Sequence, residues 1–161
     1  MRKALILFSV LAFITIGRTS AQSMGSDYQT AVGVKFWPGS ITIKHFIQDN
    51  AALEGLANFW DHGFRFTGFY ELHGDVTSSA PGLKWYVGPG AHIGWYNGGW
   101  YHGDYYYRDG GLSLGIDGIL GLEYKINGAP IALSLDINPY LELASHTYVD
   151  VWGGLGVKYT F

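Results

Sequence analysis

Cysteine is absent from the 161 residues of this chain, which excludes a disulfide framework and a thiol for lipid attachment. Charged residues are scarce at 14%, against about a quarter in average soluble domains. After the first twenty residues, no apolar run reaches the roughly 20 residues that a membrane-spanning helix needs. Aromatic residues (17%) and glycine (24 residues) are plentiful instead. This combination favours β structure in a single domain.

The first residues have the pattern of a secretory signal peptide. Arg2 and Lys3 form a positive start, an apolar stretch follows, and Thr19-Ser20-Ala21 supplies small residues suited to cleavage. We therefore expect residues 1–21 to be removed and residues 22–161 to form the mature domain. An uncleaved membrane anchor is the alternative. Loss of the three basic residues of the signal leaves 10 − 3 = 7 basic against 13 acidic residues, and this net charge of −6 argues against nucleic acid as a partner.

Turn-forming residues divide the mature chain into eight segments with strand-like alternation. The predicted strands are 29–37, 40–48, 51–60, 63–72, 83–95, 112–126, 130–138 and 149–161. Most are close to the about 9–11 residues that a tilted membrane strand needs. Short links such as Asp49-Asn50 alternate with longer ones such as 96–111, as in outer-membrane barrels. Pro89 cannot donate to a strand ladder, so we expect a bulge or bend at 88–90.

Each predicted strand has one face without charge, and the strand charges all fall on the other face. In the last strand, for example, Leu155 and Val157 oppose Lys158. A one-residue register error in a membrane barrel would cost roughly 2–4 kcal/mol for each Lys or Arg placed at the bilayer midplane. This penalty explains the strict separation, and it favours a closed eight-stranded antiparallel transmembrane barrel with charges inside. A soluble barrel with an apolar interior is the alternative.

Charges in a narrow lumen are costly unless they are paired. We therefore expect the inward charges to form an ion-pair network that fills the barrel. Its predicted members are Lys35, Lys44, Glu54, Arg65, Glu71, Lys84, Asp117, Glu123, Lys125, Asp136, Asp150 and Lys158. The alternative is the selectivity lining of a small pore, although eight strands leave little open space.

No pattern in the chain indicates a catalytic, metal or cofactor site. The six histidines lack the spacing of metal ligands on strands. His92 and Ser113 are the one pair on inward faces of adjacent strands that could serve a hydrolase or acyltransferase. Nothing in the sequence places the two at one height in the barrel. We therefore expect no enzymatic activity.

The link from Tyr96 to Gly111 is rich in aromatic residues and glycine. Tyr and Trp offer large amphipathic contact areas at low entropic cost, which is typical of recognition surfaces. The candidate contact residues are Trp100, Tyr101, Tyr105, Tyr106 and Tyr107. The alternative is an aromatic girdle at headgroup level, which fits Trp37, Trp60 and Trp95 at strand ends.

The end of the chain resembles the C-terminal strand by which assembly machinery recognises outer-membrane barrels. Val157, Tyr159 and Phe161 alternate up to a terminal phenylalanine. The mature chain as a whole resembles small eight-stranded barrels of the OmpA and OmpX type, and porin-family barrels that lack a periplasmic domain. The stretches that carry this resemblance are Gly39–Ile47, Asn50–Gly55, Gly115–Tyr124 and Leu133–Asn138.

The resemblance implies a Gram-negative outer-membrane location, with membrane lipid and the barrel assembly machinery as partners. It says little about activity. The expected role is structural or in surface recognition. An accessory subunit that binds another outer-membrane protein is the alternative, ahead of a small pore.

Overall fold

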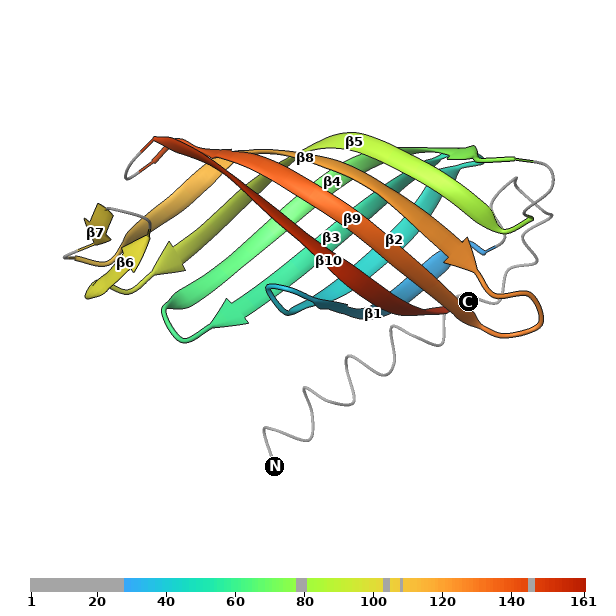
Figure 1. Cartoon of the computed structure of the whole chain (residues 1–161), viewed down its shortest axis with the longest axis horizontal. Coiled ribbons are helices and arrows are strands. Elements are labelled where there is room, and N and C mark those ends of the chain that lie inside the picture. The colour runs from blue at the N-terminus through green and yellow to red at the C-terminus, as the bar shows by residue number, and fades with distance from the viewer. Residues whose placement is uncertain (1–27, 78–80, 103–104, 108, 145–146) are drawn as a thin grey trace, which may run out of the picture.

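The computed structural model describes residues 28–77, 81–102, 105–107, 109–144 and 147–161. In these residues eight strands close into an antiparallel barrel, and two short strands form a separate pair (Figure 1). The barrel strands are β1 (Thr30–Phe36), β2 (Ser40–Gln48), β3 (Ala51–Trp60), β4 (Gly63–Asp75), β5 (Leu83–Tyr96), β8 (Gly111–Lys125), β9 (Ile131–Glu142) and β10 (Tyr148–Thr160). The small pair is β6 (Trp100–His102) and β7 (Tyr105–Tyr107). The predicted closed, eight-stranded antiparallel barrel is confirmed.

Barrel closure follows a simple meander. Each barrel strand pairs with its neighbour in the chain, and β1 pairs with β10 to complete the ring. Two strands are longer than predicted, because β4 continues to Asp75 and β9 continues to Glu142. The predicted signal peptide lies outside the described residues. Within the described part of the chain, no helix has the length and apolar character needed to span a membrane.

The bulge expected around Pro89 is not formed. Phe69 pairs with Gly90 and Leu72 with Val87, so the β4–β5 register is the same on both sides of the proline. The ladder is instead interrupted between these two pairs, which accommodates a residue without an N–H. The register shift lies in β2, between Phe46 and Gln48.

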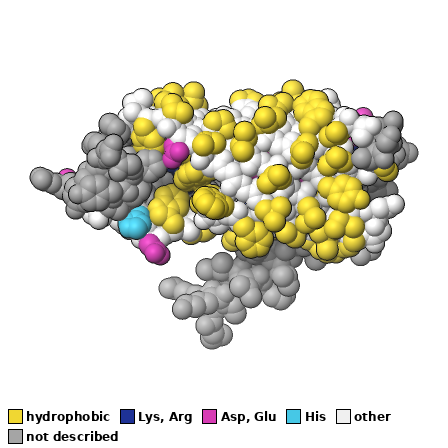
Figure 2. Space-filling view, in the orientation of Figure 1, with side chains coloured by type: hydrophobic (Ala, Val, Ile, Leu, Met, Phe, Trp, Pro, Cys, Tyr) yellow, Lys and Arg dark blue, Asp and Glu magenta, His cyan; other side chains and the backbone are white. Residues whose placement is uncertain are grey.

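The two faces of the wall separate by residue type, as the alternation predicts. Apolar side chains point outward on all eight barrel strands, with Leu120 at 51% and Leu135 at 60% exposure. Every Lys, Arg, Asp and Glu within these strands belongs to the inward set. Figure 2 shows the hydrophobic side chains spread along the visible barrel surface. The alternative of a barrel with an apolar interior is therefore wrong.

Small inward residues make room for the large ones in the lumen. A Cβ built on Gly121 would lie 2.5 Å from the ring of Tyr86 and 2.7 Å from Cβ of Asp136. Tyr86 itself is fully buried. The abundance of glycine on the inward faces thus follows from the narrow lumen of an eight-stranded barrel.

The barrel wall is shortest at the β1–β2 hairpin, on the end of the barrel away from the C-terminus. β10 begins at Tyr148 but its pairing with β1 ends at Leu155, which lies opposite Phe36. Figure 1 shows the tip of this hairpin ending well short of the β3–β4 turn. Above the tip, Trp60 of β3 and Trp152 of β10 meet edge to face, with ring centroids 6.1 Å apart. Beyond the hairpin tip, side chains such as Trp60 and Trp152 therefore take the place of backbone pairing between β3 and β10.

Candidate functional site

The lumen near the chain termini holds a cluster of paired charges, called the lysine cluster below. It contains three ammonium groups and four carboxylates, contributed by Lys35, Lys44, Lys158, Glu54, Glu71, Glu123 and Asp136. All seven side chains are buried. Seven of the eight barrel strands, all except β5, contribute a member, so the cluster crosses the lumen and ties opposite walls together.

Lys44 has a central place in this cluster. Its Nζ lies 2.7 Å from Glu71 Oε2, 3.2 Å from Glu123 Oε2 and 3.4 Å from Glu54 Oε2. The ammonium also lies 4.1 Å from the centre of the Tyr86 ring. Four favourable contacts compensate the cost of burying a charge with no exposed surface.

The other two lysines distribute the remaining negative charge. Lys158 Nζ lies 3.0 Å from Glu123 and 3.1 Å from Glu54. Lys35 Nζ lies 2.9 Å from Asp136 and 3.6 Å from Glu54. Glu54 thus contacts all three lysines. Such an internally paired arrangement fits the narrow lumen of an eight-stranded barrel.

Aromatic side chains cover the lysine cluster on the side of the termini. The Tyr28 hydroxyl donates to Glu123, and the Tyr28 ring packs edge to face on Phe46 with centroids 5.2 Å apart. His73 stacks on Tyr86, and its Nε2 lies 3.0 Å from Glu71 Oε2. These contacts shield the ion pairs from water, which strengthens them.

A second group of polar side chains lies toward the opposite end of the lumen, and is called the Arg65–His92 cluster below. Its members are Arg65, His92, Ser113, Asp117 and Glu142. His92 Nδ1 lies 2.7 Å from Asp117 Oδ2, and its Nε2 lies 3.2 Å from Glu142 Oε2. Arg65 Nη2 lies 3.4 Å from Glu142 Oε2 and donates to Ser113 Oγ at 3.3 Å.

The Arg65 guanidinium lies against two aromatic rings that also contact each other, with centroids 5.2 Å apart. Its Cζ lies 4.4 Å from the Tyr140 ring centre and 4.3 Å from the Trp152 ring centre. Arginine stacks well on aromatic faces because its planar cation is weakly hydrated. These two contacts help to fix the large Arg65 side chain in the lumen.

The structure does not join His92 and Ser113 as a catalytic pair. Ser113 Oγ donates to Glu142 Oε2 at 2.6 Å, and this carboxylate oxygen also lies 3.2 Å from His92 Nε2. A histidine acting as general base must itself accept the serine proton. Both His92 nitrogens instead face carboxylates, which is an arrangement that holds the ring in place.

Three predicted members of the lumen network lie outside both clusters. Lys84 Nζ lies 2.8 Å from Asp75 Oδ1, whose side chain is exposed. Lys125 donates to the backbone oxygens of Ile126 and Ala129 in the β8–β9 turn. Asp150 accepts from the Tyr140 hydroxyl at 3.3 Å near the start of β10. The alternation along each strand assigns these three residues to the inward face. Their positions along the barrel axis, however, place them at the ends of the barrel.

Glu142 and His73 are lumen residues that sequence reasoning missed. The predicted seventh strand ends at 138, directly before Pro139. The alternation continues beyond the proline, however, with Leu141 partly outward and Glu142 buried. Pro139 pairs with Val151 of β10, so the strand tolerates it. Continuing the period-2 pattern through the proline would have found Glu142.

The predicted recognition residues belong to the small hairpin. Trp100 pairs with Tyr107, and Tyr101 pairs with Tyr106, in the β6–β7 ladder. The segment predicted as an irregular loop therefore contains a two-stranded ribbon. It projects from the end of the barrel that lies opposite the C-terminus (Figure 1).

The predicted assembly-signal residues lie on the outer surface of β10 and directly after it. Val157, Tyr159 and Phe161 are 36%, 53% and 56% exposed. The Tyr159 and Phe161 rings pack against each other with centroids 5.0 Å apart. An apolar, outward terminal edge of this kind is available for contact with lipid or protein.

Neither a metal centre nor a known relative identifies the function. The described residues hold no group of three or more His, Asp or Glu side chains that could bind a metal ion. No family model, curated protein or solved structure matches the chain. The family resemblance read from the sequence therefore stays a prediction.

Proposed function

We propose that this protein is an integral outer-membrane barrel without catalytic activity, with a structural or surface-recognition role. The observation that carries the proposal is the facing of the wall. Apolar side chains are exposed all around the barrel, and most of the strand charges point into the lumen. In water, such a wall would be a very large apolar patch, far beyond the few hundred Å² that soluble monomers expose. In lipid, it is the favourable arrangement.

Closure of the barrel supports the same proposal. A bilayer core offers no water to satisfy backbone groups, so a spanning sheet must be closed. The pairing of β1 with β10 over Ala31–Phe36 removes the free edges over that height. We place the termini and the short β2–β3 and β8–β9 turns in the periplasm, and the β6–β7 ribbon at the cell surface. This orientation follows the usual asymmetry between short turns and longer loops.

A structural or recognition role fits the lumen better than a pore does. Lys44 and Lys158 are fully buried within ion pairs, and Arg65 is stacked across the upper lumen. The β6–β7 ribbon then supplies the candidate contact surface. The rival role of accessory subunit predicts a stoichiometric partner that co-purifies in mild detergent. A lone barrel in that preparation would argue against the rival.

The membrane proposal is tested by placing the same charge at two exposed leucines. The two variants are Leu120→Arg and Leu143→Arg. Leu120 belongs to the outward set of β8, whereas Leu143 directly follows β9 at the proposed cell-surface end. Both leucines are about half exposed, at 51% and 48%. We expect Leu120→Arg to lose roughly 2–4 kcal/mol of insertion free energy near the midplane, and Leu143→Arg to insert normally.

The measurement is detergent fractionation of cell envelopes, followed by the heat-modifiable gel shift of intact barrels. The expected result is a depleted, heat-insensitive Leu120→Arg band beside a normal Leu143→Arg band. Equal recovery of both variants in folded form would contradict the membrane assignment. So would release of the wild-type barrel from cells without detergent.

A further inference from the structure

One side of β10 has no described strand beside it at the end of the barrel that lies away from the C-terminus. β1 last pairs with β10 at Phe36, which lies opposite Leu155. β9, in contrast, pairs with β10 as far as Tyr148. Figure 1 shows β10 continuing well beyond the tip of the β1–β2 hairpin. Residues 148–152 are therefore paired on one side only, and their other side is called the open edge below.

The hydrogen bonds at the C-terminal end of β10 show which residues of this strand bond toward which neighbour. Phe161 N–H donates to Thr30 O at 2.8 Å, and Thr30 N–H donates back to Phe161 O at 3.5 Å. Thr160 N–H instead donates to Pro130 O at 2.9 Å, on the β9 side. Because an antiparallel ladder alternates, the odd-numbered residues of β10 bond toward β1 and the even-numbered residues bond toward β9.

Val149 and Val151 therefore turn their backbone groups toward the open edge. The register between β9 and β10 has no shift along the strand, so the same alternation applies here. Val151 N–H donates to the Asp150 carboxylate at 2.7 Å. No described backbone group donates to or accepts from Val149 or Val151 across the open edge. An unpaired strand edge is a template for a further strand.

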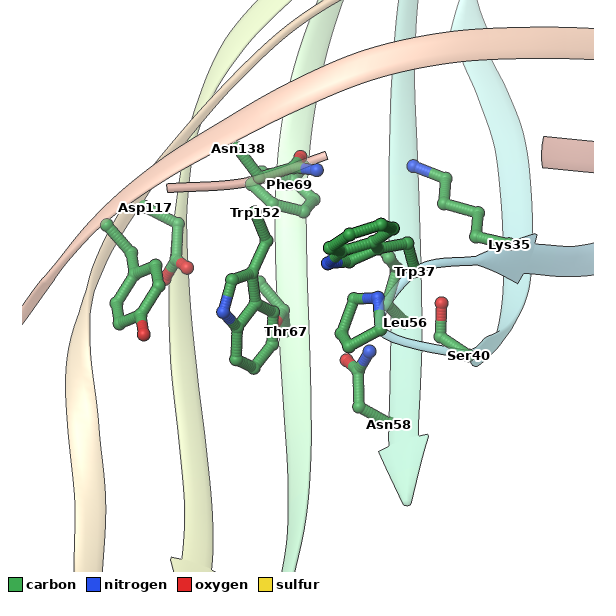
Figure 3. A pocket seen from close by; sticks show the side chains of 12 residues that line it. Lys35, Trp37, Ser40, Leu56, Asn58, Thr67, Phe69, Asp117, Asn138 and Trp152 are labelled. Atoms are coloured by element: carbon green, nitrogen blue, oxygen red, sulfur yellow. The ribbon is translucent and has the colours of Figure 1, made fainter. Parts of the chain in front are cut away.

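The two faces of the open edge differ in chemistry. Val149 and Val151 point outward and are 74% and 57% exposed. Asp150 and Trp152 belong to the inward set, and Trp152 meets Trp60 of β3 with ring centroids 6.1 Å apart. The pocket between Trp152 and the hairpin tip has room for about one water molecule (Figure 3). The binding groups of this region are therefore the backbone of the edge and the indoles, not a cavity.

The exposed charges at this end of the barrel are acidic in the described part of the chain. Asp61 and Asp109 are exposed, and Asp150 is partly exposed. The two described basic side chains that reach solvent, Lys84 and Lys125, lie at the opposite end of the barrel. The electrostatic potential around the open edge therefore favours a basic partner.

We propose that the open edge binds an extended segment of a partner protein in which basic and apolar residues alternate. Residues opposite each other in an antiparallel pair lie on the same face. Apolar residues opposite Val149 and Val151 continue the outward surface. Lys or Arg residues opposite Asp150 and Trp152 meet a carboxylate and an indole face. The inference rests on the proposed recognition role and assigns it a surface other than the β6–β7 ribbon.

A second copy of this chain fits the open edge less well than a separate peptide segment does. Two copies that share one membrane are related by an axis along the membrane normal. Their open edges then cross at twice the strand tilt, roughly 70–90°, and strands at this angle cannot form a ladder. A separate segment is free to lie antiparallel to β10.

Fluorescence anisotropy of a labelled peptide tests the proposal on the purified folded barrel in dodecyl maltoside. This detergent is uncharged and does not attract a basic peptide. The probe is a short peptide of alternating lysine and valine. We expect saturable binding that weakens as salt is added, because part of the attraction is electrostatic. Hydrogen exchange followed by mass spectrometry should show slower exchange in the segment that contains Val149 when the peptide is bound.

Two methylated forms of the probe test the backbone pairing itself. In the proposed register the valines of the peptide lie opposite Val149 and Val151, so their N–H groups point toward β10. N-methylation of the valines removes these donors, and we expect it to raise the Kd at least about tenfold. N-methylation of the lysines blocks N–H groups that point away from β10, and should change the Kd by less than about twofold.

Three variants of the barrel locate the site. Val149→Pro removes an N–H that points away from β9, so the β9–β10 ladder keeps its bonds, and we expect the Kd to rise about tenfold. Asp150→Asn should raise the Kd about threefold and reduce its salt dependence. Leu112→Val changes an outward side chain of β8 at the same barrel end and should leave the Kd unchanged. The heat-modifiable gel shift shows whether each variant is folded.

Equal affinities of the two methylated peptides for the wild-type barrel would overturn the proposal, because they would exclude backbone pairing in this register. Absence of binding by the unmodified peptide, or an unchanged Kd in folded Val149→Pro, would overturn it equally. A particle of two copies that excludes the peptide would assign the open edge to a second copy instead. These results are read on the folded barrel in detergent, so they are distinct from a failure of the membrane test.

Discussion

Substitution of Lys44 should reveal how the lysine cluster stabilises the barrel. The cluster has three ammonium groups against four carboxylates, and Lys44→Met leaves two against four. Lys44 is the lysine that lies against Glu71 in the described ion pairs, whereas Glu54 and Glu123 keep other lysine partners. After the substitution Glu71 faces only His73 at ion-pair distance. Removal of one partner from a buried ion pair costs about 3–5 kcal/mol.

Neutralising Glu71, the partner of Lys44 in this ion pair, should lower the free energy of unfolding much less. Glu71→Gln leaves three positive and three negative groups, and the amide oxygen still accepts a hydrogen bond from Lys44. Neutralising residue 71 weakens its hydrogen bond with the Lys44 ammonium but does not remove it. We expect the free energy of unfolding to fall by about 1–1.5 kcal/mol. The two members of one ion pair therefore differ by about 2 kcal/mol in their effect on the free energy of unfolding.

Urea unfolding in lipid vesicles, followed by the gel shift, measures this difference. We expect the double variant Lys44→Met/Glu71→Gln to be more stable than Lys44→Met alone, because it has fewer uncompensated carboxylates. Double-variant cycles report such coupling directly. The reasoning is refuted if Glu71→Gln destabilises as much as Lys44→Met, or if the two effects simply add.

Gly121→Val and Ser113→Ala test the packing of the lumen by the same unfolding measurement, and Gly68→Val on the outer face of β4 is the control. Gly121→Val should cost about 1–3 kcal/mol or more, because its Cβ would overlap the ring of Tyr86. A Cβ added at Gly68 would have no atom within 4 Å, so Gly68→Val should change stability by less than about 0.5 kcal/mol. Equal losses of stability in Gly121→Val and Gly68→Val would count against a filled lumen. Ser113→Ala should cost only about 1 kcal/mol, because Glu142 keeps its contacts with Arg65, His92 and the backbone N–H of Leu114. A loss above about 3 kcal/mol would show that this hydroxyl organises the cluster.

The facing of most barrel residues could be predicted because strand alternation is local. Lys158 and Glu54 were both assigned to the interior from the residue types beside them, and both are buried. The prediction failed where height mattered. Lys84 and Lys125 have the inward alternation but lie at the barrel ends, and alternation carries no information about position along the axis.

Local signals also misplaced two features. The predicted seventh strand ends before Pro139, whereas β9 passes through this residue and brings Glu142 into the lumen. Of the bulge or bend predicted at 88–90, the bulge is absent, because the β4–β5 ladder opens beside Pro89 without a change of register. In both cases the neighbouring strands hold the chain in an extended conformation that the proline alone would not specify.

From its sequence alone, this protein is determined to be a closed β structure with its charges on one face, because charge separation with period 2 needs no knowledge of distant contacts. The tertiary structure alone decided which charges meet. Glu54 reaches Lys158, far away in the chain, only because closure of the barrel brings β10 beside β1 and across the lumen from β3. It also decided that Ser113 bonds Glu142 rather than His92, and that the wall is low above the β1–β2 hairpin. Those facts depend on strand register and unequal strand length around a ring, and local residue patterns do not encode either.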